Sequence, residues 1–488
     1  MFAAAEQKRF ERARLSRDAR FDGRFFVGVK TTGIYCRPIC PANAPKRENI
    51  EFYPSAAAAS EAGLRPCLRC RPETAPGTPA WLGTSTTVRR GLRLIESGAL
   101  DNDGVDTLAD RLGVTSRHLR RLFQKHLGAS PLSVANTQRL HFAKRLIDQT
   151  NLPLREVAFA AGYRSVRRFN DEFLKTYQRS PRELRAKQRH RDTDTDGDAL
   201  TVRLRYREPF DWQQALGFFV FRATPGVESV GSREYARSIR HAGVSGLIVV
   251  RHNEPGSLSV SIQGVPTSAI FPVVQRARSM FDVDAPVAEI EACLARDPAL
   301  ASRLPGARGI RVPGVWNGFE LAVRAILGQQ VSVAAATTMA GRVAERYGDA
   351  VHVDGHAAIT RHFPEPERLM RARFNDMGLI GSRIQSIREL ARAVENGDLS
   401  LNEDADPAET RRELVKIRGI GDWTAQYIAM RALKDPDAFP ASDLGLLRAF
   451  DSSLGRRIKP AELENLSEAW RPWRAYAALL LWRTSTGG

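Results

Sequence analysis

Four of the five cysteines in this chain fall into two close pairs near its start. Cys36 and Cys40 form one pair, and Cys67 and Cys70 form the other. Such pairs are typical of a tetrahedral Zn²⁺ site with four sulfur ligands, because thiols stay reduced in the cytosol and seldom form disulfides there. We therefore expect the four thiols to hold one zinc ion; two pairs of buried or redox-active thiols are the alternative. The surrounding block has few large apolar residues, so we expect it to need the metal in order to fold.

The chain is basic, and its charge is unevenly distributed. Lys and Arg number 73 against 55 Asp and Glu, a formal net charge of +18 over 488 residues. Residues 1–80 carry +6 and residues 81–190 carry +11, which leaves +1 for the last 298 residues. Such an excess points to a polyanionic partner, most often nucleic acid. Any nucleic-acid binding by the last segment must therefore come from local groups.

Neither a targeting segment nor a membrane segment is evident. No apolar run approaches the roughly 18 residues that a membrane span needs, and the first residues are polar and basic, without the apolar stretch of a secretory signal. Hydrophobic residues make up 43% and charged residues 26% of the chain, as in ordinary soluble domains. We expect a cytoplasmic, nucleoid-associated protein without a membrane partner, divided into several domains of roughly 100 to 200 residues.

Two similar segments follow the cysteine block. Residues 106–125 place apolar side chains at helical spacing, with Gly113 breaking the run and Thr115 or Ser116 available to cap a second helix. Residues 154–175 repeat this arrangement, and residues 133–149 have the length of a helix that joins the two copies. The pattern predicts two helix-turn-helix units, although many small helical bundles share it. The candidates for DNA contact lie on the second helices: Arg117, His118, Arg120, Arg121, Arg167 and Arg168.

The rest of the chain changes from strands to helices. Residues 247–250 and 258–262 flank the turn Asn253–Gly256 as a β-hairpin, and helical patterns prevail after Pro286. Gly419 and Gly421 then separate two helices. This places backbone N–H groups at a helix start, where a phosphate can bind without a basic side chain; an ordinary helix connector is the alternative. We expect a multidomain protein, mainly α with α+β parts.

The cysteine block resembles the N-terminal domain of the Ada methylation-response family. The similarity rests on Val29–Pro38, on Arg47–Asn49 and on Arg65–Cys70. In that family the four cysteines bind Zn²⁺, and the cysteine that matches Cys36 takes a methyl group from a methylphosphotriester in DNA, so the resemblance implies both roles here. The chemistry is reasonable because a zinc-bound thiol stays deprotonated and the thiolate is the nucleophilic form. A purely structural zinc ribbon is the alternative.

The blocks that follow resemble two further DNA-acting families. Residues 82–190, ending in Tyr177–Arg185, look like an AraC-type DNA-binding domain. Residues 200–485 closely resemble the AlkA alkylbase glycosylases of the helix-hairpin-helix superfamily. This second similarity rests on four segments: Ala325–Ala334, Leu414–Ile428, Phe439–Leu446 and Trp470–Ala477.

The AlkA resemblance implies a catalytic aspartate at Asp443 and an aromatic base pocket formed by Trp423, Tyr427 and Trp482. N-glycosidic cleavage builds positive charge on the sugar, which a carboxylate stabilises. An N-alkylated purine is already cationic, so it needs no protonation and stacks well on electron-rich rings once it has left the helix. Asp443 could instead be a helix N-cap, and the three aromatic residues could be ordinary residues of the hydrophobic core. The resemblance also implies DNA contacts at Gln330, Arg418, Gly419, Gly421 and Thr424.

Four positions refine this resemblance. Trp423 stands in place of the hairpin lysine that strand-cutting relatives use as a nucleophile, which predicts a monofunctional glycosylase. Cys293 is the one cysteine in this block, so the iron–sulfur cluster of some relatives is not expected. Gln330 stands where a leucine often fills the gap left by the extruded base, and Leu444 stands where a tyrosine can follow the aspartate. These two departures leave the range of excised bases open.

Together these features predict five segments: a zinc methyl-acceptor domain at 1–78, an AraC-type domain at 82–190, a linker at 191–199, an α/β subdomain at 200–285 and a helix-hairpin-helix domain at 286–488. A Pro-rich connector is expected at 72–79. We expect a monomer that binds Zn²⁺ and double-stranded DNA, excises alkylated bases such as 3-methyladenine, accepts methyl groups from phosphotriesters and activates transcription, with RNA polymerase as a further partner. One alternative is a transcription regulator whose last block is an inactive DNA-binding module. Another is a repair enzyme whose basic middle block only holds DNA.

Overall fold

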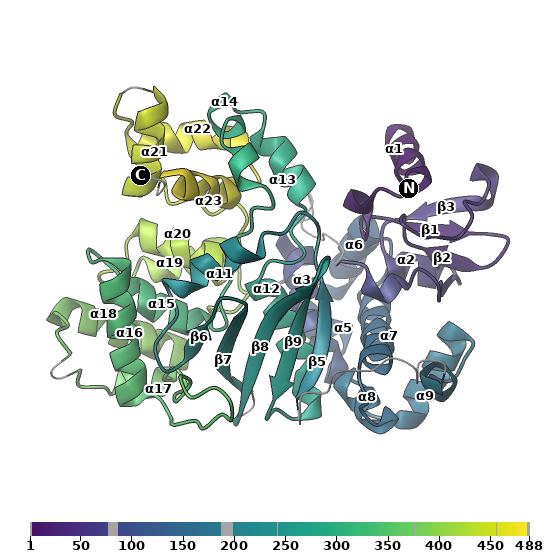
Figure 1. Ribbon diagram of the computed structural model, residues 1–488, viewed down its shortest axis with the longest axis horizontal. Coiled ribbons are helices and arrows are strands. Elements are labelled where there is room, and N and C mark those ends of the chain that lie inside the picture. Colours follow the sequence, from purple (N-terminus) through teal and green to yellow (C-terminus); the bar gives the residue numbers. More distant parts are fainter. Residues whose placement is uncertain are drawn as a thin grey trace. The chain divides into compact units, whose positions relative to one another are not determined.

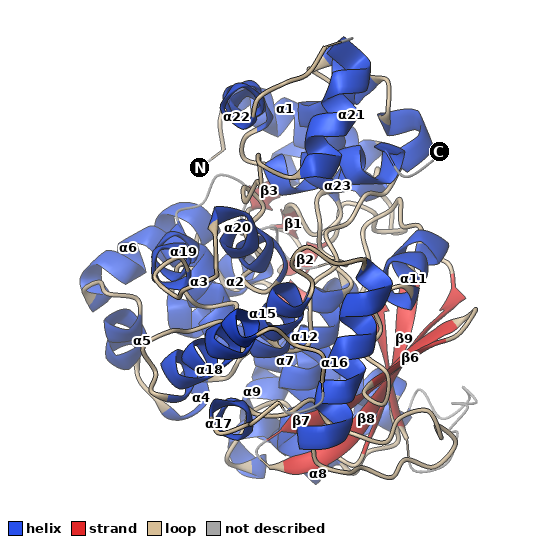
Figure 2. Cartoon of the chain, turned by 90° about the vertical axis from the view of Figure 1, so that its left-hand side faces the viewer, coloured by secondary structure: helices blue, strands red, loops and turns tan. Residues whose placement is uncertain are grey.

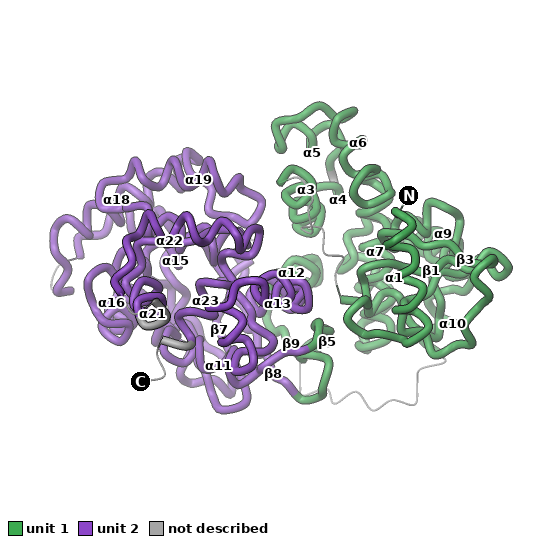
Figure 3. The backbone as a smooth tube through the Cα atoms, turned by 90° about the horizontal axis from the view of Figure 1, so that it is seen from above, with its two compact units in different colours: residues 1–208, 253–276 green, residues 209–252, 277–488 purple. Residues whose placement is uncertain are grey.

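The computed structural model describes residues 2–76, 86–186, 199–241, 243–374, 377–454 and 456–485. Helices dominate these residues, with strands in smaller number (Figure 2). The chain forms two compact units: unit 1 comprises residues 1–208 and 253–276, and unit 2 comprises residues 209–252 and 277–488 (Figure 3). None of the helices in the described ranges is both long enough and apolar enough to span a membrane. The multidomain, mainly α architecture with α+β parts is confirmed.

The first 76 residues form a small α+β body, here called the N-terminal module (Figure 1). Its sheet has the strand order β3-β1-β2-β4, in which β1 is antiparallel to β2 and β3, and β2 is parallel to β4. Phe10 stacks on Phe25 at 4.3 Å, and Phe52 meets both rings edge-on. The module therefore has an aromatic core of its own, which the sequence did not predict. Its elements are α1 (Ala4–Leu15), β1 (Phe26–Val29), β2 (Ile34–Cys36), β3 (Ile50–Tyr53), α2 (Ala56–Glu61) and β4 (Arg65–Pro66).

Two helix pairs follow in unit 1 and match the predicted helix-turn-helix units. Thr115 caps the second helix of the first pair by accepting the His118 backbone N–H at 3.3 Å, and Ser165 caps its counterpart in the second pair. Gly113 lies in the first turn with φ +68°, a left-handed conformation that glycine adopts without strain. The elements are α3 (Thr86–Glu96), α4 (Ala99–Asn102), α5 (Val105–Arg111), α6 (Ser116–Leu127), the joining helix α7 (Pro131–Gln149), α8 (Leu154–Ala160), α9 (Val166–Tyr177) and α10 (Pro181–Ala186).

Helix α7 is also the support on which the N-terminal module packs. Lys144 lies between two carboxylates, 2.5 Å from Asp148 on its own helix and 3.6 Å from Glu73 of the module, and all three side chains are buried. Arg71 of the module pairs with both Asp148 and Glu73. Tyr35, which precedes the first cysteine, places its hydroxyl 2.9 Å from Nε2 of His141.

These contacts revise the Pro-rich connector that the sequence predicted at residues 72–79. Its first part, Pro72–Thr74, forms a buried 3-10 turn that belongs to the packed module. The remaining part lies mostly in 77–85, outside the described residues, as does most of the predicted linker 191–199, since 187–198 are also outside them. The predicted domain boundaries there remain predictions.

Five strands of the second half of the chain form antiparallel pairs. In unit 2, β6 (Glu228–Val230) pairs with β7 (Glu234–His241), and β7 pairs with β8 (Val244–Glu254). In unit 1, β5 (Leu200–Arg205) pairs with β9 (Ser257–Gln263). Strands β8 and β9 flank Pro255 and Gly256, in agreement with the predicted hairpin at 247–262.

The helical part of unit 2 surrounds α15 (Gly318–Leu327), which is buried along nearly its whole length. Its apolar side chains share one core with those of α16, α18 and α20. The neighbouring helices are α11 (Trp212–Val220), α13 (Val287–Leu294), α14 (Pro298–Ala301), α16 (Val333–Tyr347), α17 (Pro366–Met370), α18 (Gly381–Glu395), α19 (Pro407–Leu414), α20 (Asp422–Arg431), α21 (Leu444–Leu454), α22 (Pro460–Ser467) and α23 (Arg474–Ser485). Helix α12 (Ile270–Met280) runs across the division between the units.

A buried ion cluster joins α15 to the strands of unit 2. Glu228 of β6 lies 3.0 Å from Arg324 of α15 and 3.6 Å from Arg237 of β7, and Arg237 pairs with Glu320 of α15 at 2.8 Å. Burial acts to raise the pKa of Glu228, but Arg324 and Arg237 outweigh it and hold this pKa below its ordinary value. Loss of one partner would leave a buried charge uncompensated, so the cluster ties the helix to the sheet in one alignment.

The buried imidazole of His141 predicts acid sensitivity of unit 1. Burial, together with the nearby charges of Arg145 and Lys144, lowers the pKa of His141 to about 3. The unfolded chain protonates this residue near pH 6.5 while the folded chain keeps it neutral, so stability is lost as pH falls below 6.5. Between pH 7 and pH 5 we expect the free energy of unfolding to fall by about 2 kcal/mol. Hydrogen exchange of the α7 amides at the two pH values measures this loss of stability. His141→Gln should remove the part of the pH dependence that comes from His141. An equal pH dependence in both proteins would contradict the assignment.

Candidate active site and metal centre

The Asp443 carboxylate is held by three neutral N–H donors from three parts of the chain. The indole Nε1 of Trp423, on α20, donates to Oδ2 at 2.8 Å, and that of Trp482, on α23, donates to Oδ1 at 2.8 Å. The backbone N–H of Leu446, in the first turn of α21, donates to Oδ1 at 2.9 Å. Asp443 is thus a helix cap, as the alternative interpretation expected, and it also accepts hydrogen bonds from two indole groups.

This arrangement fixes the carboxylate without cancelling its charge. Each of the three donors is neutral, so the hydrogen bonds orient the carboxylate without placing a positive charge beside it. Gly445 makes the close approach possible, because a Cβ at that position would lie 3.0 Å from Asp443 Oδ1 and 3.3 Å from Trp482 Cδ1. Asp443 is only half-buried, so a ligand can reach it. The site can stabilise positive charge that develops next to it.

The predicted aromatic residues form a wall beside this carboxylate. Trp423 and Tyr427 lie one helical turn apart on α20 and stack on each other, with ring centroids 5.4 Å apart and an interplanar angle of 7°. Both are half-buried, as is Trp482. Part of each ring is therefore accessible, although Tyr427 also packs against the core of unit 2. The exposed face of the wall can take a planar ligand.

Three residues that the sequence did not single out complete the wall. The buried guanidinium of Arg431 donates to the Tyr427 hydroxyl at 2.7 Å and lies 4.7 Å from the ring centre of Phe218. Arg222 covers the same Phe218 ring at 4.1 Å. Burial acts to raise the pKa of Tyr427, but Arg431 and Arg222 hold it below its ordinary value. The spacing of Arg431 four residues after Tyr427 was an available signal, since such residues are neighbours on a helix.

The glycine turn between α19 and α20 has the predicted hairpin geometry. Gly419 has φ +87°, and a Cβ there would lie 2.4 Å from Ser386 Oγ. Both the left-handed backbone conformation and the lack of space for a side chain therefore require glycine. Arg418, Gly419 and Gly421 are exposed, as a surface for DNA requires. Thr424 is different: the whole residue is 3% exposed and its hydroxyl accepts a hydrogen bond from Gln329 Nε2 at 3.3 Å, so this position offers little surface to DNA.

The loop between α15 and α16 is attached to this turn. Gln329 Nε2 donates to the Gly419 carbonyl oxygen at 2.8 Å and to Thr424 Oγ1 at 3.3 Å. The next residue, Gln330, is exposed and has φ +57°, an uncommon left-handed conformation for a residue with a side chain. Strain of this kind is often found at binding sites. Leu444, the other departure noted in the sequence, is exposed beside Asp443.

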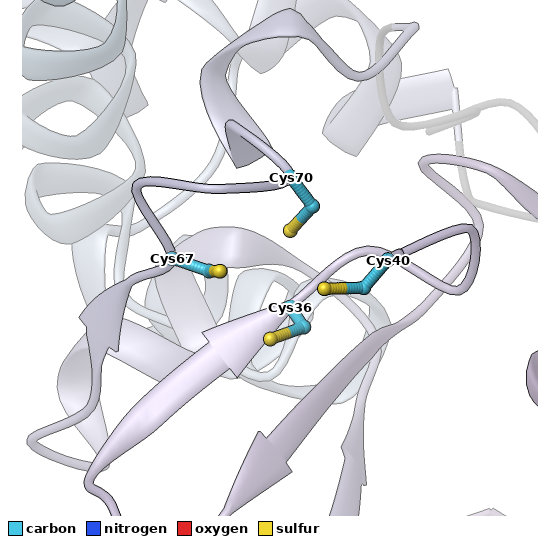
Figure 4. Close-up of side chains that lie close together, drawn as sticks. All are labelled: Cys36, Cys40, Cys67 and Cys70. Carbon is cyan, nitrogen blue, oxygen red and sulfur yellow. The ribbon is translucent and has the colours of Figure 1, made fainter. Parts of the chain in front are cut away.

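The four paired cysteines converge in the N-terminal module (Figure 4). Their Sγ atoms all lie within 4.8 Å of one another. Four thiolates around Zn²⁺ at about 2.3 Å have sulfur–sulfur separations of about 3.8 Å, so this donor set fits the ion after small side-chain movements. Cys36 ends β2, and the other three cysteines lie in the loops that follow β2 and β4. The four-thiolate zinc site predicted from the sequence is confirmed.

A buried arginine organises the loops of this metal centre. The backbone N–H of Arg37 donates to Cys70 Sγ at 3.3 Å, and its guanidinium donates to the Cys70 carbonyl oxygen at 3.1 Å and to Thr74 Oγ1 at 2.7 Å. The same guanidinium pairs with buried Asp22. Cys70 is thereby the most enclosed of the four ligands, while Cys36, Cys40 and Cys67 are partly exposed.

The predicted arginines of the helix-turn-helix pair all lie on exposed positions of their second helices. Three belong to α6 and two to α9, and Arg168 is partly engaged with Glu172 at 2.9 Å. His118 accompanies them, with Nδ1 3.0 Å from Arg121. The set is Arg117, Arg120 and Arg121 on α6, with Arg167 and Arg168 on α9.

Four known families match successive parts of the chain. Residues 9–73 match the metal binding domain of Ada, and residues 108–187 match a helix-turn-helix domain. Residues 201–317 match the AlkA N-terminal domain, and residues 323–475 match the HhH-GPD superfamily of base excision DNA repair proteins. Their order is the order in which the sequence predicted such blocks.

Individual relatives cover both the whole chain and its second half. A probable bifunctional transcriptional activator/DNA repair enzyme AlkA of Mycobacterium tuberculosis (strain CDC 1551 / Oshkosh) is 41% identical over 479 residues, 98% of this chain and 96% of the relative. DNA-3-methyladenine glycosylase 2 of Escherichia coli (strain K12) is 32% identical over 289 residues, 58% of this chain and 96% of the relative. The structure of a 3-methyladenine DNA-glycosylase from Archaeoglobus fulgidus shares the fold, with a TM-score of 0.53, 21% identity and coverage of 58% of this chain and 98% of that one.

The fold and the two sites define a class of DNA-acting protein in which a base excision repair domain follows a metal centre and a helix-turn-helix pair. Its partner is DNA. The chain belongs to the family of bifunctional transcriptional activator/DNA repair enzymes of the AlkA type.

The cysteine cluster predicts one zinc ion per chain. Cys40→Ser removes a thiolate that the tetrahedral site needs, so we expect its zinc content to fall close to zero and the amides of β1 and β2 to lose protection from hydrogen exchange. Elemental analysis of the purified full-length protein measures the metal. Cys293→Ser is the matched control, because Cys293 is not a member of the cluster, and it should keep the zinc. Full zinc content in Cys40→Ser would contradict the assignment.

Proposed function

We propose that unit 2 is a monofunctional DNA-3-methyladenine glycosylase in which Asp443 carries the chemistry. The single observation that supports this most strongly is a half-buried carboxylate fixed by two indole N–H groups beside a stacked aromatic wall. The names of the relatives agree with this activity.

The reaction follows from the charge of this carboxylate. As the bond between the sugar C1′ and the base nitrogen breaks, positive charge builds on the sugar, and Asp443 stabilises it at close range. An alkylated base that is already cationic leaves as a neutral molecule. Water adds to C1′ and gives up a proton, which leaves an abasic site in an intact strand. No lysine stands at Trp423 to form a Schiff base with the sugar, so strand cleavage is not part of the activity.

Stacking on the wall of Trp423 and Tyr427 selects planar, electron-poor bases. The positive charges of buried Arg431 and partly exposed Arg222 act against a cationic base, so selectivity depends on contact with the aromatic rings and on the attraction of Asp443. The hairpin turn holds the DNA backbone through the exposed N–H groups at the start of α20, assisted by Arg418. Gln330 meets the duplex where the base has left it.

The N-terminal module is proposed to accept methyl groups from methylphosphotriesters in DNA, with Cys36 as the acceptor. A bound Zn²⁺ would keep the thiols deprotonated. The Cys36 sulfur attacks the methyl carbon, the carbon–oxygen bond breaks, and a phosphodiester anion leaves. The product is a thioether that does not return its methyl group, so each chain acts once. One negative charge is lost from the centre, which weakens its repulsion of the DNA backbone.

The helix-turn-helix pair is proposed to direct the chain to promoter sites. Five exposed arginines on α6 and α9 and the +11 charge of residues 81–190 support this role. Activation of transcription through contact with RNA polymerase, and action as a monomer, belong to the same proposal. The AlkA family membership favours activation over a middle block that only holds DNA.

The glycosylase proposal is tested by Asp443→Asn. This change keeps the size of the side chain and removes its charge, so we expect the release of 3-methyladenine from methylated DNA to fall by about 100-fold or more. Single-turnover release of the base, measured by chromatography, gives the rate. Release by Asp443→Asn at the wild-type rate would refute the role of this residue.

Trp482→Phe provides a graded variant, because it keeps an aromatic ring but loses the indole donor to Asp443. We expect an intermediate loss of about tenfold, in line with the loss of one hydrogen bond to a charged group. Trp212→Phe is the control, because this ring packs on Phe281 and is not one of the three donors to Asp443. It should leave the rate unchanged.

The methyl-acceptor proposal is tested with DNA that carries labelled methylphosphotriesters. We expect at most one methyl group per chain, located on Cys36 by mass spectrometry of the digested protein, and none in Cys36→Ala. Cys293→Ser should take up the label normally. Uptake by Cys36→Ala would assign the acceptor elsewhere.

A further inference from the structure

Several large apolar side chains that are exposed lie next in sequence to residues of the candidate active site and its neighbouring loops. Phe221, just after α11, is 70% exposed, the highest fraction of any large apolar side chain in the described part of the chain, and Leu444, next to Asp443, is 67% exposed. Val331 and Val333, which follow Gln330, are also exposed. Single exposed apolar residues are common, but a group that borders one site indicates a surface that a ligand covers.

The backbone beneath Phe221 is firmly held although its side chain is free. Its carbonyl oxygen accepts a hydrogen bond of 3.2 Å from Thr337 Oγ1, on the helix that begins at Val333. The carbonyl oxygen of the next residue, Arg222, accepts from the guanidinium of Arg324. Both anchors lie in unit 2, so the aromatic ring projects from a fixed support rather than from a loose loop.

Contacts connect the segment that carries Phe221 both to the aromatic wall and to the helix that follows the Gln330 loop. On one side, Arg222 covers the Phe218 ring at 4.1 Å, and Phe218 shares Arg431 with Tyr427. On the other side, Thr337 connects Phe221 to the helix that follows the Gln330 loop. The segment that carries Phe221 is therefore linked to the wall on which a base would stack and to the helix beside the Gln330 loop.

We propose that Phe221 inserts into the DNA duplex beside the extruded base and stacks on the base pair left exposed there. This inference rests on the proposed glycosylase function. Extrusion opens a gap between two base pairs whose flat, apolar faces lose their stacking partner. Apolar and aromatic side chains fill such gaps, whereas the polar side chain of Gln330 stacks poorly. The partner of this surface is thus duplex DNA with one base turned out.

The test compares Phe221→Ala with the wild type on two duplexes that carry the same alkylated base, one with the base paired and one with it mispaired. Loss of a stacking ring should slow single-turnover release from the paired duplex by about tenfold. A mispaired base costs less to extrude, so the same variant should be slowed much less on that substrate. Phe221→Leu should recover most of the rate, because it restores apolar volume.

Val244→Ala is the matched control, since Val244 is an exposed apolar residue at the start of β8 and should have no effect on either substrate. Phe221→Ala at the wild-type rate on the paired duplex would overturn the inference. So would an equal slowing on both duplexes, which would indicate a general loss of binding or folding. If the wild type released no base from either duplex, the glycosylase proposal itself would fail, and this inference with it.

Discussion

The hydrogen bonds from two indole groups to Asp443 impose the strictest requirement on unit 2. They need α20, α23 and the start of α21 to meet at one carboxylate, and they tolerate little displacement because N–H donors act over short distances. From there the contacts continue inward: Trp423 stacks on Tyr427, and Tyr427 accepts a hydrogen bond from buried Arg431. Arg431 in turn donates to the backbone carbonyl oxygens of Pro313 and Gly314, which precede α15. The charge of one side chain is thus positioned by the packing of the whole helical core.

Buried ion pairs set the alignment of parts within each unit. Glu228 and Arg324 join the strands of unit 2 to its central helix. In unit 1, Lys144 and Asp148 of α7 pair with Glu73 and Arg71 of the N-terminal module. Such pairs add little net stability, because desolvation offsets their attraction, but a misaligned arrangement would leave charges unpaired. In both units they specify geometry more than they add strength.

Much of this organisation could be predicted from the sequence, and the exceptions share a physical cause. Helix caps, glycine turns and cysteine pairs are local signals, so the helix-turn-helix pair, the hairpin and the metal centre were predicted close to their observed limits. The aromatic core of the N-terminal module was missed because Phe10, Phe25 and Phe52 are far apart in sequence and follow no period. The role of Arg431 was missed because arginine is usually exposed, and the sequence does not show that this one is buried. Thr424 has the position of a DNA contact but turns inward, which depends on the neighbouring loop.

The turn at Pro72–Thr74 has a consequence for how such chains can be recombined. The last zinc ligand is Cys70, yet Arg71 and Glu73, which follow directly, are the residues that pair with α7. A single short stretch therefore belongs to the metal centre and to the support beneath it. A chimera joined immediately after the last cysteine would bring a foreign sequence against the buried Lys144–Asp148 pair, which would lose its contacts with Glu73 and Arg71. Exchange of the module between relatives should succeed only where the crossover lies beyond Thr74 or where α7 is exchanged as well.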